Sequence, residues 1–257
     1  MNMKNYLKIY LRERPLFISI IRSKEAELFE GALPLKKPIL DFGCGDGFFT
    51  KLVFGEIGGI DVGLDIDQKS LKEAKVQKIY KKVVKYDGEA LPFGDGVFST
   101  VISNCVLEHI PNLRNSLSEI HRVLKTKGKF ICSVMTSNWE NYMFGPKLLG
   151  KLYLKWMRHK QNHYNLLTLR KWNGQFKDAG FKIVKVKGYL REQDSLLMDI
   201  LHYFSVDSLW TKKLLDKWVV FPQRYDIIPV ERWLKKRSDG KVSPSKSSAL
   251  FFVLEKI

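Results

Sequence analysis

The sequence predicts an α/β fold, with a mostly parallel sheet of seven strands, helices on both faces and a helical cap or insertion. Short apolar runs alternate with helical segments from residue 38 to residue 134, and this alternation is typical of strand–helix–strand units. Two later apolar runs, 181–186 and 249–254, would complete the sheet. A chain of 257 residues with 45% hydrophobic residues is long enough to bury such a core.

Each expected element has a local signal. Strands are expected over 38–43, 61–66, 83–86, 98–104 and 129–134, and helices over 47–54, 68–79 and 112–124. Asp67 is placed to cap the second helix, since a short acidic side chain at that position accepts from backbone N–H groups. The turn Lys127-Gly128 ends the third helix.

The chain is expected to divide into four parts. Residues 1–37 would form an N-terminal helical segment that acts as a cap, and residues 38–134 the ligand-binding core. Residues 135–180 would form a linker and basic amphipathic helices over the active site. Residues 181–257 would supply the last two strands, with a helical insertion at about 190–245.

Composition limits the setting in which the protein works. No apolar stretch reaches the length of a membrane span, and Cys44, Cys105 and Cys132 lack metal-ligand spacing, which favours a reduced, cytoplasmic protein without a metal site. The net charge is +17, and the excess of basic residues lies outside the core: residues 39–133 hold 13 basic and 12 acidic side chains, whereas residues 134–257 hold 23 and 11. Such flanks attract phosphates of nucleic acid, lipid or metabolite, or form a solvated surface without a specific partner.

Three glycines follow the first strand, in the run Asp41-Phe42-Gly43-Cys44-Gly45-Asp46-Gly47. Glycines at a strand-to-helix turn let a ligand approach the main chain, and we expect backbone N–H groups to face that ligand. A dinucleotide-binding turn would need a small residue where Phe48 stands, which argues against a nicotinamide-dependent oxidoreductase. Asp41 suits a ligand that carries an ammonium or sulfonium group.

These residues resemble the first motif of class I S-adenosylmethionine-dependent methyltransferases. Three later stretches extend the resemblance at the expected intervals: Gly63-Leu64-Asp65-Ile66-Asp67, Asp87-Gly88-Glu89-Ala90-Leu91-Pro92-Phe93 and Ser103-Asn104-Cys105-Val106-Leu107-Glu108-His109-Ile110. The last of these, together with residues 119–129, resembles the type 11 subgroup, although Thr126-Lys127 stands where that subgroup usually has Pro-Gly. The match covers residues 38–134.

The resemblance implies a Rossmann-like fold, S-adenosyl-L-methionine as cofactor, and a role for each motif. The glycine loop, with Asp41, Gly43, Cys44, Gly45 and Gly47, would hold the methionine part and the ribose. Asp65 and its neighbour Ile66 would hold the ribose hydroxyls, and Asp87, Gly88 and Glu89 the adenine. Asn104 and His109 would lie near the reacting methyl group.

His109 is the candidate general base, because neutral imidazole accepts a proton near physiological pH. The alternative is a turn residue without a catalytic part. His159, His163 and Tyr164 form a second cluster, which either folds over the cofactor or lies in a surface connection. Methyl transfer itself demands little from side chains, because placing donor and acceptor in line supplies much of the barrier reduction.

The expected acceptor is a small molecule or a lipid-linked one. The Asn/Asp-Pro-Pro-aromatic run of exocyclic amine methyltransferases and the Pro-Cys of cytosine C5 enzymes are both missing, which argues against a nucleic-acid substrate. A nucleic-acid methyltransferase and a non-catalytic cofactor-binding protein are kept as alternatives. The segment 147–158 reads as a basic amphipathic helix, and residues 195–225 repeat this pattern. They would either form a lid over the pocket or contact an anionic membrane surface, which would make the protein peripheral to the membrane.

Overall fold

The computed structural model describes residues 4–203, 205, 207–223, 225 and 229–257. Within them lies one seven-stranded sheet: β1 (Ile39–Phe42), β2 (Ile60–Asp65), β3 (Tyr80–Lys85), β4 (Phe98–Asn104), β5 (Leu124–Met135), β6 (Phe181–Gly188) and β7 (Ala249–Lys256). The strand order is β3-β2-β1-β4-β5-β7-β6, and β7 runs antiparallel to both neighbours while the pairs from β3 to β5 are parallel. The predicted α/β class is confirmed.

Helices connect the strands and extend beyond them. Those of the core are α3 (Phe48–Phe54), α4 (Gln68–Val76), α5 (Leu113–Val123) and α8 (Leu169–Asp178), with the short 3-10 turns η1 (Gly55–Ile57), η2 (Leu107–His109) and η3 (Pro244–Lys246). The others are α1 (Tyr6–Glu13), α2 (Leu16–Glu30), α6 (Asn138–Tyr142), α7 (Gly145–Gln161), α9 (Glu192–Tyr203), α10 (Asp207–Leu215) and α12 (Val230–Ser238).

Side-chain caps explain where several helices begin. Asn5, Asp67, Asn112 and Thr168 each accept a hydrogen bond from a backbone N–H in the first turn of the helix that follows. The predicted cap is confirmed, because the Asp67 carboxylate accepts from the Ser70 amide at 2.7 Å. Such caps contribute about 1 kcal/mol each to stability.

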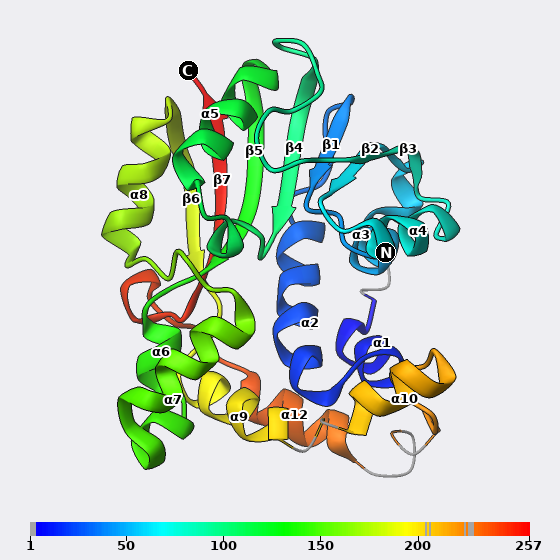
Figure 1. Ribbon diagram of the computed structural model, residues 1–257, viewed down its shortest axis with the longest axis vertical. Coiled ribbons are helices and arrows are strands. Elements are labelled where there is room, and N and C mark those ends of the chain that lie inside the picture. The colour runs from blue at the N-terminus through cyan, green and yellow to red at the C-terminus, as the bar shows by residue number, and fades with distance from the viewer. Residues whose placement is uncertain (1–3, 204, 206, 224, 226–228) are drawn as a thin grey trace.

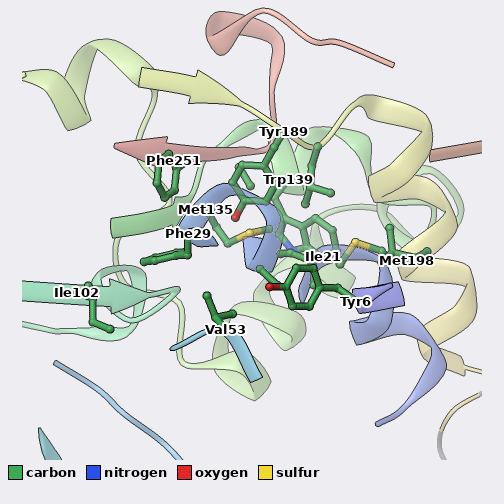
Figure 2. Close-up of a cluster of buried hydrophobic side chains, with 14 of the residues drawn as sticks. Tyr6, Ile21, Phe29, Val53, Ile102, Met135, Trp139, Tyr189, Met198 and Phe251 are labelled. Atoms are coloured by element: carbon green, nitrogen blue, oxygen red, sulfur yellow. The ribbon is translucent and has the colours of Figure 1, made fainter. Parts of the chain in front are cut away.

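The two faces of the sheet bury separate apolar cores. Along β5, Phe130 and Cys132 point into a core shared with α5 and α8, while Ile131 points into one shared with α2 and α3. Figure 2 shows the second core, where Phe29 of α2 lies beside Phe251 of β7, with ring centroids 5.2 Å apart. This alternation fixes α2 against the sheet and so determines which of its residues reach the strand ends.

A layer of helices lies beyond the carboxyl end of β4. In Figure 1 the arrow of β4 points toward α2, and α1, α9, α10 and α12 follow below it. The tertiary contacts agree, since α1 packs on α12 and α2 on α9, which brings residues near the two ends of the chain together. Ligands of parallel α/β sheets bind at the carboxyl ends of the strands, so this layer covers the place where a site is expected.

Candidate active site

The glycine loop between β1 and α3 has a backbone that other residues would strain. Gly43, Gly45 and Gly47 have φ angles of +77°, +53° and +74°. A Cβ on Gly43 would lie 2.4 Å from the Val106 side chain, whereas a Cβ on Gly45 would meet nothing within 4 Å. Gly43 therefore allows close packing, and Gly45 presents bare backbone to open space.

The amides of this loop bond within the protein. The N–H groups of Gly43 and Cys44 both donate to the carbonyl of Leu64, at 2.8 and 2.9 Å. The Gly45 N–H donates to Oδ2 of Asp65 at 2.8 Å, and the Gly47 N–H donates to the Cys44 carbonyl at 3.1 Å. The expectation that these N–H groups face a ligand is wrong, because the end of β2 already satisfies the first three. The loop instead lets a ligand come close to a backbone whose shape is already fixed.

Asp65 ends β2 and holds two backbone groups. Its Oδ1 accepts from the Asp67 amide at 2.9 Å, while Oδ2 accepts from Gly45. Each carboxylate oxygen retains a further lone pair, so the side chain can still accept from a ligand. Ile66 follows it on the surface.

After β3 the chain turns through Asp87, Gly88 and Glu89, which are exposed. Oδ1 of Asp87 accepts from the Glu89 amide at 2.9 Å, which is the hydrogen bond of an Asx turn. Gly88 has a φ of +95°, and a Cβ there would meet nothing within 4 Å. This turn therefore gives the site a second stretch of bare backbone.

Two cavities meet at this edge of the sheet. The larger, of about 1030 Å³, is lined by many of the predicted residues: Gly43, Asp65, Ile66, Asp87, Gly88, Glu89, Asn104 and His109. The smaller, of about 360 Å³, is lined by Asp41, Gly43, Cys44, Gly45 and Asn104 among others. Gly43 and Asn104 line both cavities, which places the junction beside the ends of β1 and β4. Gly47 lines neither cavity and packs instead against α4 and the Tyr80 ring.

Asp41 is buried at the end of β1. The hydroxyls of Thr50 and Tyr80 both donate to its Oδ2, at 2.5 and 2.6 Å. Burial raises the pKa of Asp41 to about 6, although the two hydroxyls oppose that rise and the charge of Asp65 adds to it. Within the described part of the chain no group donates to Oδ1, so this oxygen remains for a cation in the smaller cavity.

Asn104 and His109 flank the turn that follows β4. Ser133 donates to Oδ1 of Asn104 at 2.5 Å, which fixes the amide at the cavity junction. The His109 ring stacks on His163 at 4.8 Å between centroids, and its Nδ1 lies 3.3 Å from the Asn162 carbonyl. Burial, followed by the neighbouring His109 and Arg158, lowers the pKa of His163 to about 4, so the His163 ring is neutral at physiological pH.

The segment that carries the second histidine cluster packs against η2. The amides of Tyr164 and Asn165 donate to the Glu108 carbonyl at 2.8 and 3.0 Å. Only His163 of the cluster reaches His109, while His159 and Tyr164 are exposed. The segment therefore supports the His109 turn from outside the cavity.

Sequence reasoning missed the residues that the N-terminal helices bring to the site. Tyr10, Arg14 and Arg22 line the smaller cavity, and Arg22 also lines the larger. Arg14 pairs with Asp46 of the glycine loop at 2.6 Å, and its guanidinium lies 4.1 Å from the centroid of the Phe48 ring. No local motif marks these residues, because α1 and α2 read only as apolar helices with interspersed basic residues. The signal that could have pointed to them is the spacing of the arginines in the N-terminal segment.

The arrangement fits the cofactor that the motifs imply. Gly45 and Gly88 present open backbone to the cavities, and Asp65 and Asp87 supply acceptors beside it. Tyr10 lines the smaller cavity, and its buried hydroxyl has no hydrogen-bond partner among the described residues. The same part of the chain holds no group of three or more His, Cys, Asp or Glu side chains able to bind a metal ion. None of its helices combines the length and the apolar character that crossing a membrane requires.

Comparisons with known proteins agree with this geometry. Residues 40–132 match the family model of a methyltransferase domain. An uncharacterized protein of Methanocaldococcus jannaschii is 32% identical over 169 residues, which cover 65% of this chain and 74% of that protein. Demethylmenaquinone methyltransferase of Staphylococcus carnosus is 30% identical over 170 residues, which cover 58% of this chain and 70% of that enzyme.

A solved structure shows the same fold over nearly the whole chain. It is a SAM-dependent methyltransferase of Thermotoga maritima, described as a possible histamine N-methyltransferase, with a TM-score of 0.60 and 16% identity over 94% of this chain and 92% of that one. At that identity the likeness shows the fold, whereas the sequence relatives show the family. The protein therefore belongs to the type 11 group of class I methyltransferases, enzymes that take their methyl group from S-adenosyl-L-methionine.

Proposed function

We propose that this methyltransferase transfers a methyl group to a small, apolar, lipid-linked acceptor, and that the transfer takes place where the two cavities meet. The junction is the observation that carries the proposal. The larger cavity combines carboxylates with bare backbone, and aromatic rings wall the smaller one. Because Gly43 and Asn104 line both, a cofactor bound along the strand ends would extend through this junction, and the acceptor would meet it there.

The cofactor residues follow from the groups that face the cavities. Asp65 would accept from the ribose hydroxyls with its remaining lone pairs, while Asp87, Gly88 and Glu89 border the place of the adenine. The glycine loop would hold the methionine part against its fixed backbone. The bound cofactor supplies a methyl group already activated by the sulfonium, so the protein has to orient the two reactants and exclude water.

An apolar acceptor would occupy the part of the smaller cavity that the methionine part of the cofactor leaves free, against its aromatic rings. The rings of Phe17, Phe48, Phe49 and Trp218 line it, and they come from the N-terminal segment, α3 and the chain that follows α10. Burial of apolar surface in such a cavity is favourable by about 25 cal/mol per Å². The Staphylococcus carnosus relative acts on demethylmenaquinone, as its name states, which supports this acceptor class.

His109 is the proposed base for an acceptor that must lose a proton. It lines the larger cavity and stacks on the neutral ring of His163. A positioned base of this kind contributes about 10²- to 10⁴-fold to the rate. For an acceptor that needs no deprotonation, His109 would be a wall residue.

In this proposal, residues 1–37 and 190–245 form a cap over the core, residues 38–134. Arg14 and Tyr10 of the N-terminal segment and Trp218 of the insertion all reach the smaller cavity, so both parts of the cap would shape it. Residues 135–180 then serve two purposes, because α8 buries Trp172 and Phe176 in the core while α7 lies at the surface.

We further propose that the protein works in the cytoplasm at the surface of an anionic membrane, where a lipid-linked acceptor resides. On α7, Leu148, Leu152 and Trp156 are 71%, 81% and 52% exposed, whereas Tyr153 and Met157 face the protein. The helix carries five basic residues and no acidic one. Exposed apolar side chains between lysines are the pattern of an interfacial helix, since the chains insert and the lysines pair with lipid phosphates.

One experiment tests the acceptor class. The purified protein is incubated with methyl-labelled S-adenosylmethionine and either a total lipid extract, a soluble metabolite extract or RNA. We expect the label in the lipid fraction, and none after denaturation of the protein. Label confined to RNA or to polar metabolites would contradict the proposal, and calorimetric binding of S-adenosylhomocysteine without any labelled product would favour a non-catalytic protein.

A second experiment tests membrane contact. Binding to sedimented vesicles of phosphatidylcholine alone is compared with binding to vesicles that contain phosphatidylglycerol. We expect binding to the anionic vesicles, lowered by added salt and by Leu152→Ser together with Trp156→Ser. Val76→Ser is the matched control, because Val76 is 76% exposed, close to Leu152, but lies on α4. Equal binding by the double variant would refute the role of α7.

A further inference from the structure

Arg22 occupies the junction of the two cavities. It lies on α2, lines both cavities, and its side chain is 24% exposed. Nη1 donates to Oε2 of Glu25 at 2.7 Å, and no other hydrogen bond from the guanidinium is made within the described residues. Since a guanidinium has five N–H donors, most of them remain for a ligand at the place where donor and acceptor meet.

A buried carboxylate fixes this arginine. Glu25 is fully buried, and its Oε1 accepts from the Tyr189 hydroxyl at 2.7 Å and from Sγ of Cys105 at 3.0 Å. These two partners come from the ends of β6 and β4, so Glu25 ties α2 to the sheet. The oxygens of Glu25 are thereby bonded within the protein. Of the Arg22–Glu25 pair, the arginine is the residue that faces the cavities.

Tyr10 adds a second donor in the smaller cavity. It is 2% exposed, and its hydroxyl has no hydrogen-bond partner among the described residues. Burial raises the pKa of the Tyr10 hydroxyl, and among the charged groups around it Arg22 opposes that rise most strongly. A buried hydroxyl without a partner costs about 1–3 kcal/mol, which a ligand oxygen would recover.

The same cavity holds an acid of the opposite character. Asp41 lines it together with the glycine-loop residues Gly43 and Gly45. A cavity with a carboxylate at one place and an arginine with a tyrosine at another matches a zwitterionic amino acid, whose ammonium would face Asp41 and whose carboxylate would face Arg22. We propose that Arg22 and Tyr10 form the subsite for the carboxylate of the cofactor's methionine part, with Glu25 as the residue that positions Arg22.

This inference rests on the proposed placement of the cofactor, and binding measurements test it without an acceptor. Titration calorimetry compares S-adenosylhomocysteine with decarboxylated S-adenosylhomocysteine, which keeps the ammonium but lacks the carboxylate. We expect Arg22→Gln to weaken binding of the first ligand by about 10- to 100-fold and to leave binding of the second within twofold, as for a lost hydrogen bond to a charged group. Arg22→Lys should recover part of the loss.

Tyr10→Phe provides a test that folding defects cannot imitate. Because the hydroxyl lacks a partner in the free protein, its removal should leave the melting temperature unchanged or raise it. It should nevertheless weaken S-adenosylhomocysteine binding several-fold while sparing the decarboxylated ligand.

Arg14→Gln is the matched control, since Arg14 lines the same cavity but is paired with Asp46. A larger selective loss from Arg14→Gln than from Arg22→Gln would overturn the assignment. Equal weakening of both ligands by Arg22→Gln would overturn it as well. If the wild-type protein bound neither ligand, the cofactor placement itself would be wrong. Normal binding of both ligands by the Arg22→Gln variant would instead contradict only the assignment of Arg22.

Discussion

The buried carboxylate at the end of β1 should make the stability of the protein depend on pH. Asp41 is taken out of water and has a pKa of about 6, compared with 3.8 for an exposed aspartate. Asp41→Asn keeps the shape of the side chain and retains an oxygen that can accept from Thr50 and Tyr80, whose hydroxyls bond to Oδ2 in the wild type. The substitution thus removes the charge and little else.

The sign and size of the effect follow from proton linkage. The folded state binds the Asp41 proton more tightly than the unfolded state, so the wild type loses stability as the pH rises from 3.8 through about 6. At 1.36 kcal/mol per pH unit, the full loss is about 3 kcal/mol. Part of it has already occurred at pH 4.5, which leaves about 2 kcal/mol between pH 4.5 and pH 7.5.

Urea unfolding of both proteins, followed by circular dichroism at pH 4.5, 5.5, 6.5 and 7.5, measures this difference. We expect the free energy of unfolding of Asp41→Asn, relative to wild type, to rise by about 2 kcal/mol across the range, with the steepest change below pH 6.5. Asp178→Asn, at the exposed end of α8, should show a constant difference. A flat difference for Asp41→Asn would refute the buried, destabilised carboxylate.

Three further substitutions test the site. Asp65→Ala should weaken S-adenosylhomocysteine binding by about 1.5–3 kcal/mol in calorimetry, since it removes a charged acceptor and frees the Gly45 amide; an unchanged dissociation constant would remove Asp65 from the site. Gly43→Ala should destabilise the protein by about 2–4 kcal/mol in urea unfolding, because its Cβ would overlap the Val106 side chain at a positive φ; Val106→Ala in the same chain should restore part of this loss. His109→Gln should lower kcat about 10²- to 10⁴-fold for an acceptor that is deprotonated, with cofactor affinity unchanged; a normal kcat at all pH values would exclude a base.

The core of the fold could be predicted because its signals are local. The apolar runs of β1, β4 and β7 and the cap at Asp67 are each written within a few consecutive residues. The boundary between α5 and β5 was predicted wrongly. The helix was expected to end at Leu124, but Leu124 begins β5 and pairs with Phe98 of β4. A long-range strand pair overrides the local turn signal there.

The surface of α7 shows a second limit of local reasoning. Its lysines and leucines alternate as expected for an amphipathic helix, but the sequence does not say which face meets the protein. In the structure Tyr153 and Met157 are buried, and Leu148 and Leu152 point outward. Gly150, with a φ of +66° inside the helix, makes a kink that separates two helical segments. Tertiary packing therefore decides the orientation, which the helical period alone does not fix.

The used amides of the glycine loop explain why the site has to draw on the cap. Since Gly43, Cys44 and Gly45 donate to the end of β2, the loop is fixed before a ligand arrives and has few donors left for an anionic group. Donors for such a group stand on α1 and α2, where Tyr10 and Arg22 line the smaller cavity. Glu25, which holds Arg22, accepts hydrogen bonds from Cys105 and Tyr189, which are 80 and 164 positions away in the sequence. The orientation of Arg22 therefore depends on the folded sheet. Cofactor binding and the packing of the N-terminal helices are consequently coupled: a change that loosens α2 from the sheet should weaken binding even though it touches no ligand atom.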